Sequence, residues 1–219
     1  MPVRLQWHSC SRIKGGKTKL RLEHSYCVID KGLSTALCAR IVETGEAAES
    51  MDAQVIRDPE NNVRNSTVSW IGFDGDTAWL YDAVTQVVRE SNERLWRWTL
   101  SGPESMQYTR YGEEQYYTWH ADQRRKPYPP DDRRWPGLTR KLSVVVSLSN
   151  ADDYEGGDFM LETLDAPPHD TERRLKTLRE IRNLGSVLIF PSFLYHQVTP
   201  VTAGFRKSLV AWFLGPPFV

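Results

Sequence analysis

Two histidines and one aspartate are the residues whose types and spacing could hold a metal ion. His120 and Asp122 form a His-x-Asp step, and His196 follows 74 positions after the aspartate. Side chains two residues apart in a strand point to the same face, so the step offers two ligands to one point. A third ligand must then come from a neighbouring strand. Two imidazoles and a carboxylate on one face of a mononuclear Fe(II) leave its other face open. The spacing therefore predicts a non-haem iron site.

A basic residue beyond the second histidine could bind the far carboxylate of an acidic co-substrate. Arg206 opens the run RKSLVAWFLG, ten positions after His196. A guanidinium can make a bidentate pair with a carboxylate. Ser208 lies two residues further on, so it should point the same way and add a hydroxyl group. Lys207 should face the other side of the strand.

Each candidate also has an ordinary structural explanation. A lone His-x-Asp step arises by chance in many proteins, and an isolated arginine is usually a solvated strand-end residue. The combination of the His-x-Asp step, the second histidine and the arginine, in this order and in strand contexts, favours the metal site. His8, His24 and His169 lack such a context, and we expect them to be structural or surface residues.

Aromatic residues upstream of the first ligand could shape a pocket. Tyr111 and Tyr117 precede His120 by nine and three positions. Both could face the barrel interior, although packing in the core explains each of them equally well. Trp119 and Trp212 are expected to be packing residues.

Length and composition fit one domain over residues 1–219. The chain has 28 Lys plus Arg and 28 Asp plus Glu, so no net charge favours nucleic acid or a membrane surface. The first residues lack the apolar stretch of a signal peptide, and no apolar run is long enough to span a membrane. Cys10, Cys27 and Cys38 match no zinc or disulfide pattern. These features predict a cytoplasmic protein; none of them specifies an oligomeric state.

The first 104 residues should form helices and strands that support a second part. A short strand is expected at 25–30, followed by a helix that Asp30 or Ser34 caps, and another strand at 66–72. Apolar residues at helical spacing after Asp76 or Thr77 predict a helix that ends near 92–96.

Short strand-like runs separated by turns fill residues 105–215. This pattern, after two helices, predicts a mainly β fold with flanking helices around a jelly roll. The proline-rich, charged segment 124–137 should be a surface loop. The segment 165–183 is a charged insertion, in which we expect a short exposed helix beginning near Asp170.

At residues 105–215 the chain resembles the Fe(II)/2-oxoglutarate-dependent oxygenases of prolyl 4-hydroxylase type, including bacterial hydroxylases of the prolyl and lysyl type. Three segments carry the likeness: YGEEQYYTWHAD, RKLSVVVSLSNADDYEGGDFMLE and GSVLIFPSFLYHQVTPVTAGFRKSLVAWF. The resemblance implies a double-stranded β-helix (a cupin-like jelly roll). It also implies Fe(II), 2-oxoglutarate as co-substrate, consumption of O2 and assistance by ascorbate.

Carried over residue by residue, the resemblance makes His120, Asp122 and His196 the iron ligands. It also implies that Arg206 binds the distal carboxylate of 2-oxoglutarate, together with Ser208 and Tyr111. The aspartate ligand occupies the place that a halide would need, which favours hydroxylation over halogenation. Two departures concern the substrate: Glu113-Glu114 stand where the family usually has a glycine, and the insertion 165–183 is long.

Three functions remain open at this point. The first is hydroxylation of a prolyl or other residue in a peptide or protein, with the loop 124–137 as a lid whose Tyr128 and Trp135 contact the peptide. The second is hydroxylation of a free amino acid or small metabolite, which needs a charged clamp such as Arg64. Tyr117 is a further candidate for substrate contact. The third is a non-catalytic jelly roll that binds a ligand, which loss of any iron ligand would favour.

Overall fold

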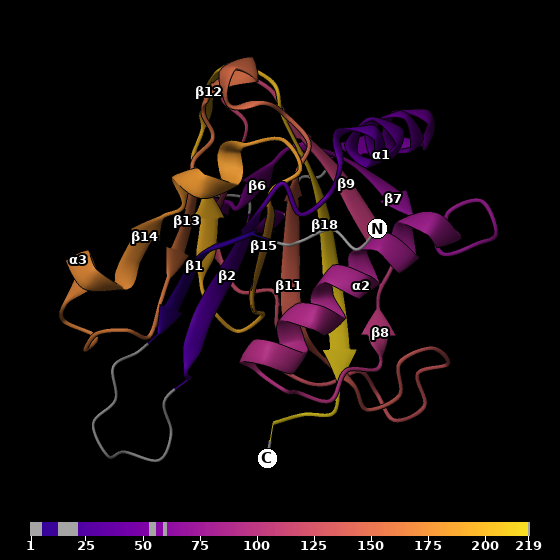
Figure 1. The fold of residues 1–219 in the computed structure, drawn as a ribbon, viewed down its shortest axis with the longest axis vertical. Helices are drawn as coiled ribbons and strands as arrows, with labels where there is room; N and C mark the ends of the chain where they lie inside the picture. The colour runs from indigo at the N-terminus through magenta and orange to yellow at the C-terminus, as the bar shows by residue number, and fades with distance from the viewer. Residues whose placement is uncertain (1–5, 13–21, 53–55, 59–60, 219) are drawn as a thin grey trace.

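Two unequal antiparallel sheets, with helices against the larger one, make up the part of the chain that the structure describes (Figure 1). The structure is a computed structural model and describes residues 6–12, 22–52, 56–58 and 61–218. The side chains of His8 and Cys10 lie outside this description. In the described residues, no helix has the length and apolar character needed to cross a membrane.

The large sheet combines strands from the first third of the chain with strands from the predicted core. Its order is β1 (Gln6–Arg12), β2 (His24–Asp30), β15 (Val187–Pro191), β11 (Thr139–Ser147), β18 (Arg206–Gly215), β9 (Met106–Tyr111), β7 (Thr67–Ile71) and β3 (Ser50–Asp52), with β8 (Gly102–Pro103) paired to β18. The long central strands β11 and β18 supply residues that line one wall of a cavity.

The smaller sheet carries both candidate histidine ligands. Its order is β14 (Leu175–Thr177), β13 (Phe159–Glu162), β16 (His196–Val198), β10 (Tyr116–His120) and β6 (Arg64–Asn65). Two separate pairs complete the strands, namely β12 (Tyr154–Gly156) with β17 (Val201–Gly204), and β4 (Ile56–Asp58) with β5 (Asn61–Asn62).

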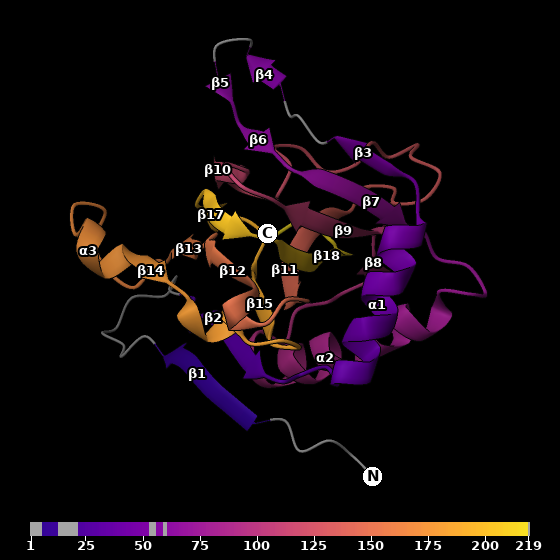
Figure 2. The same cartoon turned by 90° about the horizontal axis from the view of Figure 1, so that it is seen from above.

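The two longer helices match the sequence prediction. α1 (Thr35–Ala47) begins at Ser34, whose side chain accepts a hydrogen bond from the backbone N–H of Leu37. α2 (Ala78–Leu95) follows Thr77 and carries its buried residues along one face. Seen from above in Figure 2, both helices lie beside the large sheet and away from β10, β13 and β14.

Alternation along the central strand explains why the large sheet has two buried faces. On β11, Val144 and Val146 pack in the cluster that includes the apolar faces of α1 and α2. Val145, pointing the other way, packs in the cluster that faces the small sheet, together with Phe159 and Phe190. The face of the large sheet that carries Val145 also lines this cavity.

Strands are present throughout residues 105–215, where the sequence predicted strand-like runs, and residues 121–138 contain no helix or strand, as expected of the loop 124–137. The prediction for 165–183 was incomplete. A helical turn, α3 (Thr171–Arg174), begins after Asp170, but the next residues form β14 at the edge of the small sheet. Charged side chains hid this strand because an edge strand needs few apolar residues.

Candidate active site

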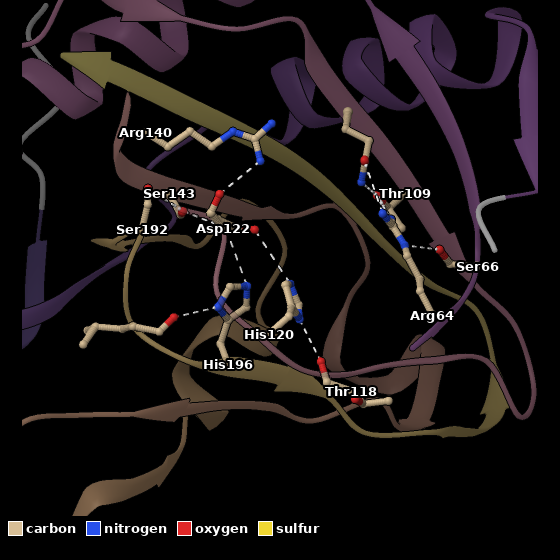
Figure 3. A network of polar contacts seen from close by, with 12 residues as sticks. Arg64, Ser66, Thr109, Thr118, His120, Asp122, Arg140, Ser143, Ser192 and His196 are labelled. Atoms are coloured by element: carbon tan, nitrogen blue, oxygen red, sulfur yellow. Dashed lines mark hydrogen bonds and ion pairs between the residues drawn. The ribbon is translucent and has the colours of Figure 1, made fainter. Parts of the chain in front are cut away.

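The pairing of β10 with β16 brings the two histidines together. His120 lies opposite His196 in the register of these antiparallel strands, and their ring centroids are 4.1 Å apart. Figure 3 shows both imidazoles directed toward Asp122. The Nε2 atoms of His120 and His196 lie 3.7 Å and 3.6 Å from the two carboxylate oxygens of Asp122. One ligand atom from each of the three residues lies within 4.8 Å of the others.

Backbone carbonyls orient both imidazoles. Nδ1 of His120 is 2.7 Å from the carbonyl oxygen of Thr118, and Nδ1 of His196 is 3.1 Å from that of Leu194. A carbonyl can only accept, so each Nδ1 carries a proton and Nε2 is the ring nitrogen that is directed toward the shared centre. This outer hydrogen bond is the usual device that fixes a metal-binding histidine.

Asp122 is held by residues far from it in the sequence. The prediction placed it in a strand with His120, but β10 ends at His120 and Asp122 lies in the bend that follows. The chain turns there because the backbone N–H of Gln123 donates to the carbonyl of Ser192, 2.8 Å away. The hydroxyl of Ser143 donates to Asp122 Oδ2 at 2.7 Å. The carboxylate therefore reaches the centre through a turn.

Burial and neighbouring charges set the ionisation of two of these groups. Burial lowers the pKa of His120 to about 3, and the adjacent His196 adds to the effect. The imidazole is thus neutral at pH 7, which is the form that binds a metal. Burial opposes ionisation of Asp122, but His196, His120, Arg140 and the Ser143 hydroxyl outweigh it and hold its pKa below the usual value.

This donor set fits Fe(II). Two imidazoles and one carboxylate converge from one side, and the cavity lies on the other side. A carboxylate buried between two imidazoles would destabilise the fold unless a cation bound to all three groups.

The candidate residues for the co-substrate line the same cavity. Arg206 lies opposite Tyr111 in the pairing of β18 with β9, and both side chains are buried. Nη1 of Arg206 donates to the Ser208 hydroxyl at 3.4 Å, and no carboxylate of the described residues lies within ion-pair distance of this guanidinium. Lys207 faces away and pairs with Glu46 at 2.6 Å. A buried guanidinium with one long contact is suited to an incoming carboxylate.

Two glycines leave room for Arg206. Gly156 and Gly157 both have positive φ, at 66° and 59°. A Cβ on Gly156 would lie 2.4 Å from the carbonyl oxygen of Pro200, and one on Gly157 would lie 3.1 Å from Cδ of Arg206. The turn can therefore approach both β17 and the guanidinium only with glycine at these positions.

Two predicted substrate residues line the cavity, and two do not. Arg64 and Tyr117 are part of the wall, and the guanidinium lies 4.7 Å from the centroid of the Tyr117 ring. Tyr128 and Trp135 are not among the described residues that line it. Tyr128 instead donates its hydroxyl to Glu104 at 3.0 Å.

Sequence reasoning missed an ion pair beside Asp122. Nη2 of Arg140 lies 2.6 Å from Oε2 of Glu104, and Nη1 lies 3.4 Å from the backbone oxygen of Asp122. The guanidinium carbon is 4.0 Å from the ring centroid of Trp212, which lines the cavity although we expected it only to pack. Strand alternation alone would place Arg140 and Ser143, three residues apart, on opposite faces, and nothing in the sequence indicated the register shift between Arg140 and Leu142.

Comparison with known proteins agrees with this geometry. Residues 106–214 match the model of the 2OG-Fe(II) oxygenase superfamily. A PKHD-type hydroxylase of Alteromonas mediterranea is 34% identical over 107 residues, which cover 48% of this chain and 41% of the relative. Another, of Synechococcus sp. strain CC9605, is 37% identical over 97 residues, covering 44% and 35%. The chain thus spans about two fifths of the length of these curated relatives.

Solved structures share the fold. A Pseudomonas putida prolyl-4-hydroxylase superimposes with a TM-score of 0.61 at 21% identity, covering 87% of this chain and 92% of that one. A Trichoplax adhaerens prolyl hydroxylase, in complex with a hypoxia inducible factor peptide fragment, gives 0.63 at 20%, covering 86% and 83%. The fold is the double-stranded β-helix expected from the sequence. Over residues 106–214 the chain is identified as a member of the 2OG-Fe(II) oxygenase superfamily. Fe(II) and 2-oxoglutarate are the cofactor and co-substrate of that class.

Proposed function

We propose that the protein is an Fe(II)- and 2-oxoglutarate-dependent dioxygenase that hydroxylates an unactivated C–H bond. The observation that carries this proposal is the convergence of three metal-ligating atoms beside a buried guanidinium that lacks a carboxylate partner in the described structure. The overall reaction converts 2-oxoglutarate, O2 and R–H into succinate, CO2 and R–OH. When bound, Fe(II) supplies the redox chemistry that couples the decarboxylation to the hydroxylation.

The protein's own residues would bind and orient the reactants. His120, Asp122 and His196 would hold the iron from one side. Arg206 and Ser208 would bind the distal carboxylate of 2-oxoglutarate, with the Tyr111 ring beside them. Apolar side chains from both sheets would keep water from the reacting atoms.

The proposed substrate is a prolyl or other residue in a peptide or protein. Support comes from the PKHD-type hydroxylases among the relatives and from the prolyl hydroxylase whose structure includes a peptide fragment. A free amino acid is the second candidate, and the buried position of Arg64 favours it. A cytoplasmic location, and the absence of nucleic-acid and membrane partners, stay predictions. A non-catalytic jelly roll is disfavoured because all three ligand residues are present and converge.

The test is oxygen transfer by the iron-loaded protein. With Fe(II), 2-oxoglutarate, ascorbate and a mixed pool of peptides and amino acids, we expect succinate and a product heavier by one oxygen atom in mass spectra. Asp122→Ala should abolish both, because two imidazoles alone bind the metal weakly and leave the reactants unplaced. Asp152→Ala, at an exposed aspartate outside the cavity, is the matched control and should keep full activity. Unchanged turnover in Asp122→Ala would refute the ligand assignment.

A further inference from the structure

Arg64 is a buried guanidinium whose contacts in the described structure are all neutral. The residue is 7% exposed and lines the cavity. Nε donates to the Ser66 hydroxyl at 2.7 Å, and the two terminal nitrogens reach Gln107 Oε1 and Thr109 Oγ1 at 3.4 Å each. No described carboxylate lies within ion-pair distance of it.

The terminal nitrogens of Arg64 are poorly satisfied. Contacts of 3.4 Å are longer than the usual 2.9–3.0 Å of an N–H···O bond. The Thr109 hydroxyl also accepts from the Gln107 amide at 2.7 Å, so it is shared. A guanidinium has five N–H groups, and three are used here. A buried cation in this condition gains most from an anion that brings two oxygens.

This group lies beside the candidate iron ligands, and Thr109, to which it donates, is paired with Ser208 in the register of β9 and β18. The Tyr117 ring contacts both groups: its centroid lies 4.7 Å from the guanidinium carbon of Arg64 and 3.4 Å from the imidazole centroid of His120. Figure 3 shows Arg64 next to Thr109 and Ser66. A ligand group bound there would hold a substrate next to the reacting centre.

When Fe(II) and 2-oxoglutarate are bound, the charged groups around the cavity sum to a net charge of plus one. Three guanidinium groups (Arg64, Arg140, Arg206) face two carboxylates, Asp122 and the Glu104 that pairs with Arg140. Fe(II) and the 2-oxoglutarate dianion together add no net charge, and iron-bound histidines are neutral. Arg140 has Glu104, and Arg206 would have 2-oxoglutarate. Arg64 is the cation that remains.

We propose that Arg64 binds a carboxylate of the substrate, so that the molecule hydroxylated here is either a free amino acid or the C-terminal residue of a peptide. This inference rests on the proposed function and specifies its substrate class. Gln107 and Ser66 hold the guanidinium in place, and an internal residue of a neutral peptide would leave the cation unpaired in a dry cavity.

Matched acid and amide probes test the inference directly. The anaerobic Fe(II)–2-oxoglutarate complex is titrated calorimetrically with pools of the common amino acids and with the corresponding amino-acid amides. Tripeptides with a C-terminal carboxylate or carboxamide form the second arm. We expect the acids to bind at least about 30-fold more tightly than the amides, as for loss of a buried charged pair. The arm that binds distinguishes free amino acids from peptide ends, and mass gain of one oxygen in air identifies the product.

Variants assign the preference to Arg64. Arg64→Met should bring the acid-to-amide ratio close to one, and Arg64→Lys should restore part of it. Arg110→Met is the matched control, because Arg110 is exposed on β9 and outside the cavity lining. The affinity of Arg64→Met for 2-oxoglutarate should stay within about twofold of wild type, since removing an unpaired buried charge need not disturb the fold.

Two results would overturn the inference. One is equal binding of acids and amides to the wild-type protein, and the other is an undiminished acid preference in Arg64→Met. Both leave the proposed function standing if succinate is still released from 2-oxoglutarate. Absence of 2-oxoglutarate binding by the wild-type protein would instead overturn the proposed function, and this inference with it.

Discussion

At the scale of single residues, each candidate iron ligand is fixed by a hydrogen bond that the metal does not use. Main-chain carbonyls hold the two imidazoles, and the Ser143 hydroxyl holds Asp122. The hydroxyls of Ser143 and Ser192 are 2.9 Å apart. Because Ser143 has one hydrogen and gives it to Asp122, Ser192 must be the donor between them. The carboxylate is therefore positioned by a chain of two serines.

Ser143→Ala should weaken metal binding without removing a ligand. The carboxylate would lose its donor and could rotate, and loss of such outer contacts typically costs about 10- to 100-fold in metal affinity. Titration with Mn(II), followed by the Fe(II) dependence of succinate release, measures the effect. Ser186→Ala is the control, because this buried serine bonds a different carboxylate, that of Asp30, at 3.3 Å. Equal metal affinity in Ser143→Ala and wild type would remove the positioning role.

The sequence already singled out the candidate ligand residues, but it gave no sign of the residues that hold them in place. His120, Asp122 and His196 are recognisable because their types and order are rare in combination. Ser143 and Arg140 have ordinary types, and their relevance depends on pairing across 18 to 21 positions. Only the fold brings such partners together, so local spacing carries no signal for them.

At the scale of elements, the pairing of β10 with β16 makes the site. His120 and His196 are opposite residues in one ladder, and a slip of one residue would turn one imidazole to the other face of the sheet. The turn before β13 is the second decisive element. It brings β12 against β17 and leaves space for Arg206.

Gly156→Ala should destabilise the protein by about 2–4 kcal/mol, from the strain of positive φ and the collision with a backbone oxygen. Urea unfolding monitored by tryptophan fluorescence gives the value. Gly75→Ala is the matched control: its added Cβ meets nothing within 4 Å and its φ is not positive, so the change should be near zero. Similar stabilities for both variants would show that the turn tolerates a side chain.

Elements with strong periodicity were predictable, and edge elements were not. α2 was evident because its apolar residues recur at helical spacing, and β11 because it contains a short run of β-branched apolar residues. β14 and β8 are short edge strands, formed because a longer neighbour offers unpaired backbone groups. The sequence also separated residues 1–104 from the core, whereas the large sheet draws strands from both parts.

At the scale of the whole molecule, the site is a stability cost that the rest of the fold must offset. The two-faced large sheet buries apolar residues on both sides, and between the sheets it encloses a buried carboxylate with two imidazoles. Without a metal, these groups make the stability of the protein depend on pH.

The metal-free protein should therefore lose stability as pH falls below about 6.5. The unfolded chain protonates this histidine near the ordinary value of 6.5, whereas burial keeps His120 neutral in the folded protein until about pH 3. Protons thus favour the unfolded state throughout that interval, and the stability present above pH 6.5 is lost progressively down to pH 3. The lowered pKa of Asp122 acts in the same direction at more acidic pH.

Between pH 7.5 and 5.5, His120 alone should reduce the free energy of unfolding by about 1.4 kcal/mol, since the lower value lies one unit below the ordinary histidine pKa. Urea unfolding with EDTA at both pH values measures the difference. In His120→Gln, whose side chain is neutral throughout, that contribution should disappear and the loss should be correspondingly smaller. His169→Gln, at an exposed histidine, should behave like wild type. An identical loss in His120→Gln and wild type would show that His120 is not held neutral by burial, and its imidazole would then have to shed a proton before it could bind a metal at acidic pH.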